Sequence, residues 1–242
     1  SRLYQLDRDF FGNGDSRGLR GMEVNVRTWR RAWTPIEVRA IGEHQIRNAA
    51  AALATLDVLE QESKLIFPAS IGSSLARLRL PGRFEVFGRR PAVILEVAHN
   101  PASFRSMAET IRSILPEKHR GKRILLFAAS RDKDWASMLE QVEGLFTEIV
   151  LTSYPSQARS LPAEEMLPVA SRQAPLVRSH EPAIDAWQAI LVKTKGQQTS
   201  LARPLDDVGT EMIGEDEDLL CVAGSFYLIA ELLRRDVSSA VI

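Results

Sequence analysis

The stretch "VILEVAHNPASF", residues 93–104, contains the pattern that decides the fold class. Apolar residues run up to the carboxylate of Glu96, and His99, Asn100 and Pro101 then lead into a helical period. Asn is a favoured helix N-cap and Pro a favoured first helical residue. The order of these residues predicts a buried strand that ends close to the start of a helix.

This strand-to-helix pattern recurs from Phe84 to the end of the chain. The apolar runs are rich in Val, Ile and Leu without alternation, as in a parallel sheet buried on both faces. We expect strands at residues 84–87, 92–97, 123–128, 148–152, 176–178 and 219–223. We expect helices near residues 102–115, 135–145, 163–173, 184–193 and 226–235. The alternation predicts an α/β fold with a doubly wound, mostly parallel sheet, in which ligands bind beyond the carboxyl ends of the strands.

Residues 1–80 have a different character. Glycines interrupt a polar stretch over the first 21 residues. Strand-like runs follow at 23–30 and 36–40, and helical periods at 45–59 and 68–78. Two strands and two helices make a small core at this size. We therefore expect residues 1–80 to be the tail of another domain and residues 81–242 to be a second domain, joined at Pro81-Gly82.

Composition narrows the class of protein. Among 242 residues, 45% are hydrophobic and 26% are charged, with 31 basic and 31 acidic side chains. Such a balance is typical of a soluble globular protein and indicates no nucleic-acid or membrane partner. The single cysteine, Cys221, lies in an apolar run and fits a reducing compartment. The chain lacks a secretory pattern and an initial Met, so we expect a cytoplasmic protein and a chain cut from a longer one.

The polar stretch from Lys193 to Asp218 is rich in glycine and charge. We expect an exposed insertion there, with a functional lid as the less favoured alternative.

Two side chains of the opening stretch are candidates for binding. His99 would lie at the start of a helix, where free N–H groups and the helix dipole favour an anion such as phosphate. Glu96, near the end of the strand, would accept hydrogen bonds from ribose hydroxyls. The same residues also suit an ordinary capped helix with a solvated His and Glu, so this stretch alone leaves both interpretations open.

Two basic residues follow the same logic. Lys133, between Asp132 and Asp134 in "ASRDKDW", comes directly after an expected strand and could reach a phosphate. Arg83, in "PGRF", could bind a phosphate where two domains meet. A charged loop that ends in an Asp N-cap, and a surface arginine, are the alternatives.

The remaining candidates lie at two helix starts. Asn48, with His44 and Gln45 in "GEHQIRNAA", could read a base edge, because an amide both donates and accepts. Ser225, after Gly224 in "VAGSFYL", could bind a carboxylate or cap the helix that follows. Helix-start chemistry explains both residues equally well.

Each motif is weak alone, but their order and spacing are specific. The ordered set resembles the C-terminal portion of folylpolyglutamate synthase/dihydrofolate synthase, a branch of the Mur ligase superfamily, over roughly residues 36–235. The motifs are "GEHQIRNAAAAL", "LPGRFEVF", "LEVAHNP", "RDKD" and "VAGSFYL". The usual "LDGAHNP" of that family is changed here: Glu96 keeps the carboxylate with a longer reach, and Val97 replaces a glycine.

The resemblance implies roles for these residues. It implies a Rossmann-like Mur ligase C-terminal domain, preceded by part of the central ATPase domain. Asn48 would lie near adenine, Glu96 near the ribose, and Arg83 and His99 near the phosphates. Lys133 would lie in the same cleft and share catalysis with His99. Two further residues, Ser225 and Tyr227, match a segment on the glutamate side of the site.

The family consists of ATP-dependent amide ligases that act through an acyl phosphate. The resemblance implies ATP and Mg²⁺ as cofactors, and glutamate with folate or dihydropteroate as substrates, in a monomer. The P-loop and the Mg²⁺ ligands are expected upstream, and no G-x-x-x-x-G-K-[ST] motif occurs in this chain. A fragment of this kind would hold half of a site and be inactive alone. The alternatives are a Mur-type ligase with another acceptor and a non-catalytic nucleotide-binding or interaction module.

Overall fold

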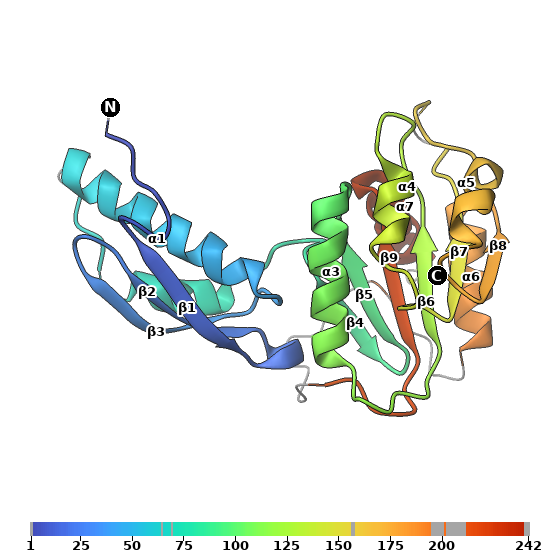
Figure 1. Ribbon diagram of the computed structural model, residues 1–242, viewed down its shortest axis with the longest axis horizontal. Helices are drawn as coiled ribbons and strands as arrows, with labels where there is room; N and C mark the ends of the chain where they lie inside the picture. The colour runs from blue at the N-terminus through green and yellow to red at the C-terminus, as the bar shows by residue number, and fades with distance from the viewer. Residues whose placement is uncertain are drawn as a thin grey trace. The chain divides into compact units, whose positions relative to one another are not determined.

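The computed structural model describes residues 2–63, 65–68, 70–155, 158–194, 201 and 212–239. The described chain divides into two compact units, one that ends at Leu80 and one that begins at Pro81 (Figure 1). Each unit has its own sheet. No helix in these ranges combines the length and the apolar character that a membrane crossing requires.

The first unit is an antiparallel sheet covered by a long helix. Its strands, in the order β1-β2-β3, are β1 (Phe11–Ser16), β2 (Met22–Arg27) and β3 (Ala32–Val38). Its helices are η1 (Gly18–Arg20), α1 (His44–Ser63), α2 (Ile71–Ser74) and η2 (Leu75–Arg77). Alternate residues of β2 are buried and pack with the apolar stripe of α1. In this stripe Ile46, Ala49, Ala50 and Leu53 are buried, and Leu56 is partly buried.

Strand β1 corrects the expectation of a polar, strand-free beginning. Its two glycines allow close approach to neighbouring elements. A Cβ at Gly12 would lie 2.9 Å from the Cβ of Ala50 on α1, and a Cβ at Gly14 would lie 2.1 Å from the Glu23 carbonyl oxygen on β2. Glycine inside a strand often marks such contacts, so the residues that suggested a loop are required by tertiary packing.

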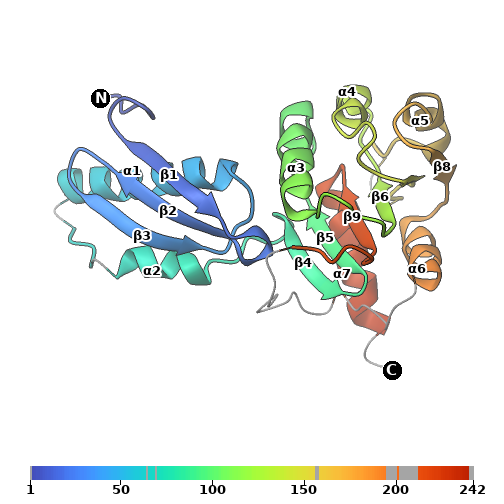
Figure 2. The same cartoon turned by 60° about the horizontal axis from the view of Figure 1, so that its bottom comes forward.

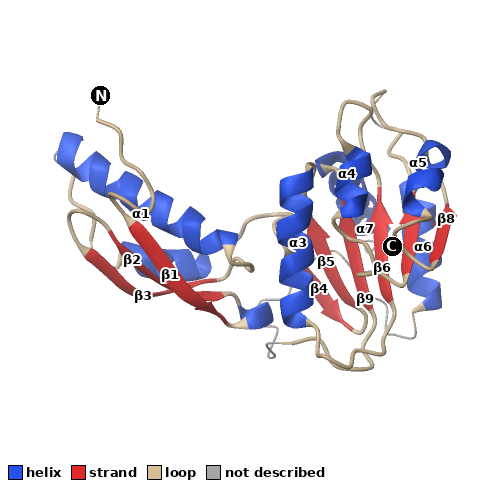
Figure 3. Ribbon diagram, viewed as in Figure 1, coloured by secondary structure: helices blue, strands red, loops and turns tan. Residues whose placement is uncertain are grey.

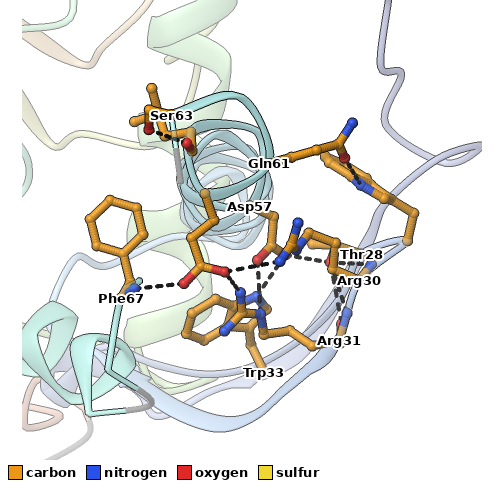
Figure 4. A network of polar contacts seen from close by, with 11 residues as sticks. Thr28, Arg30, Arg31, Trp33, Asp57, Gln61, Ser63 and Phe67 are labelled. Carbon is orange, nitrogen blue, oxygen red and sulfur yellow. Dashed lines mark hydrogen bonds and ion pairs between the residues drawn. The ribbon is translucent and has the colours of Figure 1, made fainter. Parts of the chain in front are cut away.

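A polar network ties the first unit together at one end of α1 (Figure 4). Asp57 is fully buried, and its carboxylate accepts hydrogen bonds from the Thr28 hydroxyl and, at 3.2 Å, from the Trp33 indole N–H. The Nε atom of Arg31 lies 2.8 Å from Asp57 Oδ1. Arg31 also pairs with Glu60. The network links the turn between β2 and β3 to α1.

The second unit is a six-stranded sheet with the order β4-β5-β9-β6-β7-β8. β4 runs antiparallel to β5, and all other neighbouring strands are parallel. The strands are β4 (Glu85–Arg89), β5 (Ala92–Glu96), β6 (Arg123–Phe127), β7 (Glu148–Leu151), β8 (Leu176–Ser179) and β9 (Leu219–Ala223). The helices are α3 (Pro101–Ile114), α4 (Trp135–Glu140), α5 (Ala163–Ala170), α6 (Ala183–Lys193) and α7 (Phe226–Ser239).

Helices cover both faces of this sheet (Figure 2). α3, α4 and α5 form one layer, and α6 and α7 form the other. On the α3 face, the Phe104 ring meets Phe127 edge-on, and Met107 contacts Cys221. On the other face, Trp187 of α6 and Leu228 of α7 pack on Leu95 and Val222 of the sheet. The predicted doubly wound α/β class is confirmed, and Cys221 is buried in the core.

One expectation about the end of an element was wrong, and a second falls mostly outside the described residues. The helix expected over residues 135–145 ends at Glu140, and turns carry the chain on, with Gly144 at φ +66°. The expected insertion lies partly outside the described residues, namely at 195–200 and 202–211. Its described end belongs to the fold: Ile213 is buried, and the Glu217 carbonyl oxygen lies 2.9 Å from His119 Nε2.

Candidate functional site

The sheet topology selects the carboxyl edge of the parallel strands in the second unit. The register places Glu96 of β5, Ala223 of β9 and Phe127 of β6 in one row. After β5 and β6 the chain continues into α3 and α4 on one face, whereas after β9 it continues into α7 on the other (Figure 3). Ligands of doubly wound sheets bind at such a reversal. The loops after β5, β9 and β6 are therefore the candidate site.

Gly224 joins these loops. Its N–H donates to the carbonyl of Ala98, 3.1 Å away in the loop after β5. A Cβ at Gly224 would lie 2.2 Å from the carbonyl oxygen of Ala128, which follows β6, and the backbone has φ +114°. Only glycine meets both conditions without strain. The three loops are thus held against one another by backbone contacts.

His99 is exposed at the start of α3. Its Nδ1 lies 3.0 Å from the Val97 carbonyl oxygen, so Nδ1–H donates to that oxygen, and Nε2 carries a proton only in the imidazolium form. The backbone N–H groups of His99 and Asn100 both donate to Ser103 Oγ at 3.2 Å, and Asn100 Oδ1 accepts from the Ser103 N–H in a capping box. The cap uses several backbone donors that an anion would otherwise bind, so the imidazole is the principal ligand group here.

Glu96 is buried at the end of β5, with only 7% of its surface exposed. Its Oε2 accepts a hydrogen bond of 2.9 Å from the Phe84 N–H. Burial raises the pKa of this carboxyl from 4.5 to about 7. The N–H of Phe84, the charge of Arg83 and the N–H of Ala98 lower the pKa and offset only part of that effect. Arg83 itself is exposed.

The loop after β6 carries Lys133 and is braced by a neighbouring segment. Ser130 pairs with Ser160 in a β-bridge, and the Arg131 guanidinium makes two hydrogen bonds with Glu165. Lys133 is partly exposed, and its Nζ lies 3.6 Å from Asp132 Oδ2. Asp134 accepts from the Ser137 N–H and caps α4. Of the two acids beside Lys133, one contacts the ammonium and the other starts the helix.

Ser225 and Tyr227 follow β9 at the start of α7. Ser225 is buried, and its Oγ accepts from the Tyr227 N–H at 3.2 Å. The capping role is therefore present, and a hydroxyl that accepts one hydrogen bond still has a proton to donate. The Tyr227 ring lies 5.9 Å from the ring of Tyr154, centroid to centroid.

Sequence reasoning missed Ser130 and Tyr154. The two hydroxyls lie 2.7 Å apart, and Tyr154 is fully buried. Through its ring, Tyr154 also contacts Tyr227 and so links the loops after β6, β7 and β9. Both residues follow closely after apolar runs, which is the signal that identified Lys133. Their pairing depends on strand order, which the sequence does not reveal.

Asn48 belongs to the first unit and is exposed on α1. Its Nδ2 donates to Gln45 Oε1 at 3.0 Å, and Gln45 Nε2 lies 2.9 Å from His44 Nε2. The three polar side chains that the sequence selected therefore form one chain of contacts. The other predicted site residues, Arg83, Glu96, His99, Lys133, Ser225 and Tyr227, all belong to the second unit.

The described residues hold no group of three or more His, Cys, Asp or Glu side chains that could bind a metal ion. We therefore assign no metal ligand within them.

Most of the second unit matches a known family model. Residues 82–201 match the family model of the Mur ligase, glutamate ligase domain. The folylpolyglutamate synthase of Lacticaseibacillus casei is 25% identical over 195 residues, which cover 80% of this chain and 38% of that protein. The dihydrofolate synthase/folylpolyglutamate synthase of Bacillus subtilis is 25% identical over 219 residues, covering 89% of this chain and 44% of that protein.

Solved structures show the same fold. The Escherichia coli FolC in complex with DHPP and ADP superimposes with a TM-score of 0.75 at 19% identity, over 97% of this chain and 47% of that chain. A Mycobacterium tuberculosis folylpolyglutamate synthase complexed with ADP gives a TM-score of 0.75 at 22% identity, over 96% of this chain and 48% of that chain. This chain therefore spans about half the length of these proteins, or less.

Proposed function

Because residues 82–201 match the family model of the Mur ligase, glutamate ligase domain, we propose that the chain is the C-terminal part of an ATP-dependent ligase that joins glutamate to folate or dihydropteroate. One observation carries the proposal: the loops after β5, β9 and β6 meet at Gly224 and bear His99, Ser225 and Lys133 at one edge of the sheet. Relatives named as folylpolyglutamate synthases support the substrate class.

The proposed reaction has two steps. The acceptor carboxylate takes the terminal phosphoryl group of ATP, and the amine of glutamate then attacks the acyl carbon, so that an amide forms and phosphate leaves. Phosphoryl transfer depends chiefly on positioning and on stabilisation of charge. In this proposal His99, Lys133 and Arg83 supply positive charge or N–H donors to the phosphates, and all three are at least partly exposed.

The glutamate side is assigned to Ser225 and Tyr227. The Ser225 hydroxyl caps α7 and can still donate its own proton to a carboxylate oxygen. Tyr227 is held against the buried ring of Tyr154. Residues on rigid, mutually packed loops can hold a small amino acid in a fixed orientation.

The fit to the nucleotide differs among the predicted residues. The exposed cations suit phosphate oxygens. Asn48 retains its side-chain oxygen for an adenine amine, because only its Nδ2 is used by Gln45. Glu96 fits a ribose contact poorly, since it is buried and already accepts N–H donors from Phe84 and Ala98. We derive no step through Mg²⁺, because the described residues provide no cluster that would bind it.

The proposal makes this chain half of a catalytic site. The sequence has no P-loop motif, and the relatives are at least twice as long as their matched segment. We propose that catalysis requires the other half, and that the whole protein works as a cytoplasmic monomer without a nucleic-acid or membrane partner.

The test is an assay of the full gene product for ATP-dependent attachment of glutamate to tetrahydrofolate or dihydropteroate, with a known ligase as a positive control. Product formation with either acceptor is expected. Ligation of glutamate to neither acceptor would refute the proposed activity. Binding of ADP without ligation would favour a non-catalytic module, and ligation to a cell-wall precursor would favour another Mur-type ligase.

A further inference from the structure

The segment Gly82–Phe84 has an unusual backbone. Gly82 has φ +67° and Phe84 has φ +49°, and a non-glycine residue in this left-handed region is uncommon. Such a conformation persists only when the surrounding structure holds it. Arg83, the proposed phosphate contact, lies between these two residues, so whatever holds them also places Arg83.

Glu96 and Val97 at the end of β5 hold this segment at two points. The Val97 N–H donates to the Gly82 carbonyl at 2.7 Å, and the Phe84 N–H donates to Glu96 Oε2 at 2.9 Å. A Cβ at Gly82 would lie 2.6 Å from Val97 Cγ1, so the two residues pack with no space between them. A third contact comes from Glu85, whose Oε2 accepts from the Gly82 N–H at 2.9 Å.

We propose that Glu96 and Val97 form a clamp on residues 82–84, and that Glu96 is a positioning residue for Arg83 and not a ligand of the nucleotide. The clamp lies within the second unit and stands on its own geometry. Only the purpose of placing Arg83 rests on the proposed function. The clamp also gives a physical role to Glu96 and Val97, the two residues at which "LEVAHNP" departs from the usual "LDGAHNP".

Protonation of Glu96 acts on this clamp. The ionisable groups that face Glu96 are Arg83, on the clamped segment, and Cys221, on the neighbouring strand β9, while Glu85 holds the same segment. The pKa of Glu96 is about 7 when it is buried, above its ordinary 4.5, so the closed clamp binds the proton more tightly than an open, hydrated one. Closure is therefore most favoured at low pH; the preference falls as the pH rises from about 4.5 to 7 and is level above that.

Hydrogen exchange of the Phe84 amide tests the clamp directly. The protection factor, corrected for the intrinsic rate, is measured from pH 5.5 to 8.5 in the full gene product. In the wild type it should fall about tenfold or more as the pH rises. In Glu96→Gln, which stays neutral and keeps an acceptor oxygen, it should remain high and independent of pH.

Two further variants complete this experiment. Glu96→Leu removes the acceptor, and its Phe84 protection should be about tenfold lower than that of Glu96→Gln at every pH. Glu143→Gln changes an exposed carboxylate of the same unit and should behave as the wild type. Equal Phe84 protection in wild type, Glu96→Gln and Glu96→Leu would overturn the clamp.

Titration with ADP tests the positioning role of Glu96 separately from the proposed function. Arg83→Ala and Glu96→Leu should each lower the affinity for ADP about tenfold. The double variant should bind ADP no more weakly than Arg83→Ala, because Glu96 acts through Arg83. Additive losses in the double variant would make Glu96 a ligand and overturn the positioning role. If the wild type binds no ADP, the proposed function is wrong, and the exchange pattern still decides whether the clamp exists.

Discussion

Asp57 in the first unit and Glu96 in the second are both buried carboxylates, but their surroundings differ. Asp57 in the first unit has no exposed surface and faces a guanidinium, a hydroxyl and an indole N–H (Figure 4). Glu96 in the second unit is held by backbone N–H groups, and the charge of Arg83 also acts on it. Asp57 has a partly exposed ion-pair partner, Arg31, in direct contact. Burial makes ionisation of Glu96 unfavourable and raises its pKa.

This difference indicates a structural role for Asp57 and a role at the candidate functional site for Glu96. A buried acid with a full set of side-chain partners fixes the elements around it, and removing it leaves a buried cation and unsatisfied donors. A buried acid with a perturbed pKa at the carboxyl edge of a sheet is a candidate for function. The four predictions below test this contrast, in order of their expected effect on the free energy of unfolding.

Asp57→Ala should give the largest change. It removes one of the two carboxylates that pair with Arg31, and it leaves the Thr28 hydroxyl and the Trp33 indole without the Asp57 acceptor. We expect a loss of about 3–5 kcal/mol in the stability of the first unit, measured by urea denaturation followed through tryptophan fluorescence. Asp57→Asn keeps an acceptor oxygen and should lose less, which covers the case in which the alanine variant fails to fold.

The matched control for Asp57 is Glu62→Gln, an exposed acid on the same helix. Its stability should match that of the wild type within about 0.5 kcal/mol. Similar losses in Asp57→Ala and Glu62→Gln would contradict a special role of the buried network.

Glu96→Gln should raise the stability of the protein, and only at high pH. Since the folded-state pKa of Glu96 is about 7 against an ordinary 4.5, the wild type loses stability as the pH rises from about 4.5 to 7 and is level above it. This pKa difference corresponds to at most about 3 kcal/mol. The variant should therefore be more stable than the wild type by about 2–3 kcal/mol at pH 8 and similar to it near pH 4.5, in chemical denaturation. Equal pH profiles would show that Glu96 ionises freely in the folded state.

The sheet of the second unit could be predicted from sequence because its signals are local. β9 was predicted with its observed ends and β5 within one residue, since each is an apolar run between polar residues. β1 was missed because Gly12 and Gly14 are explained only by Ala50 and Glu23, which lie on other elements. The local sequence pattern predicts an element when its own apolar residues form the buried face. It fails when a residue such as Gly12 is required by contacts with other elements.

The candidate site shows the same limit. Its position beyond the strand ends followed from the alternation of strands and helices, so His99, Lys133 and Ser225 could be selected. The contact between Glu96 and Phe84 depends on the antiparallel pairing of β4 with β5, and that between Ser130 and Tyr154 on the adjacency of β6 and β7. Nothing in the sequence near these residues indicates their partners.

Gly82→Ala should have the next largest effect. The new Cβ meets Val97 Cγ1 in a backbone with φ +67°, so strain and steric overlap combine. We expect a loss of about 2 kcal/mol by thermal or urea unfolding. In a Val97→Ala background the overlap is gone, and the same substitution should cost about 1 kcal/mol. An identical cost in both backgrounds would show that Val97 does not pack against residue 82, and would weaken the proposed clamp.

His99→Ala should change stability least and activity most. The imidazole is exposed and makes one hydrogen bond to the chain, through Nδ1 to Val97, so its removal should cost less than about 0.5 kcal/mol. If His99 donates from Nε2 to a phosphate as an imidazolium in the proposed reaction, kcat should fall about a hundredfold.

Its neighbour provides the matched control for this last prediction. Asn100→Ala removes the helix cap and should cost about 1 kcal/mol while most of the activity remains. Steady-state kinetics and melting temperatures on the full gene product separate the two residues, because a cap and a ligand group affect different measurements. If His99→Ala loses stability but not turnover, the histidine belongs with Asn100 as part of the helix start, and only Lys133 and Arg83 would remain as phosphate contacts in the second unit.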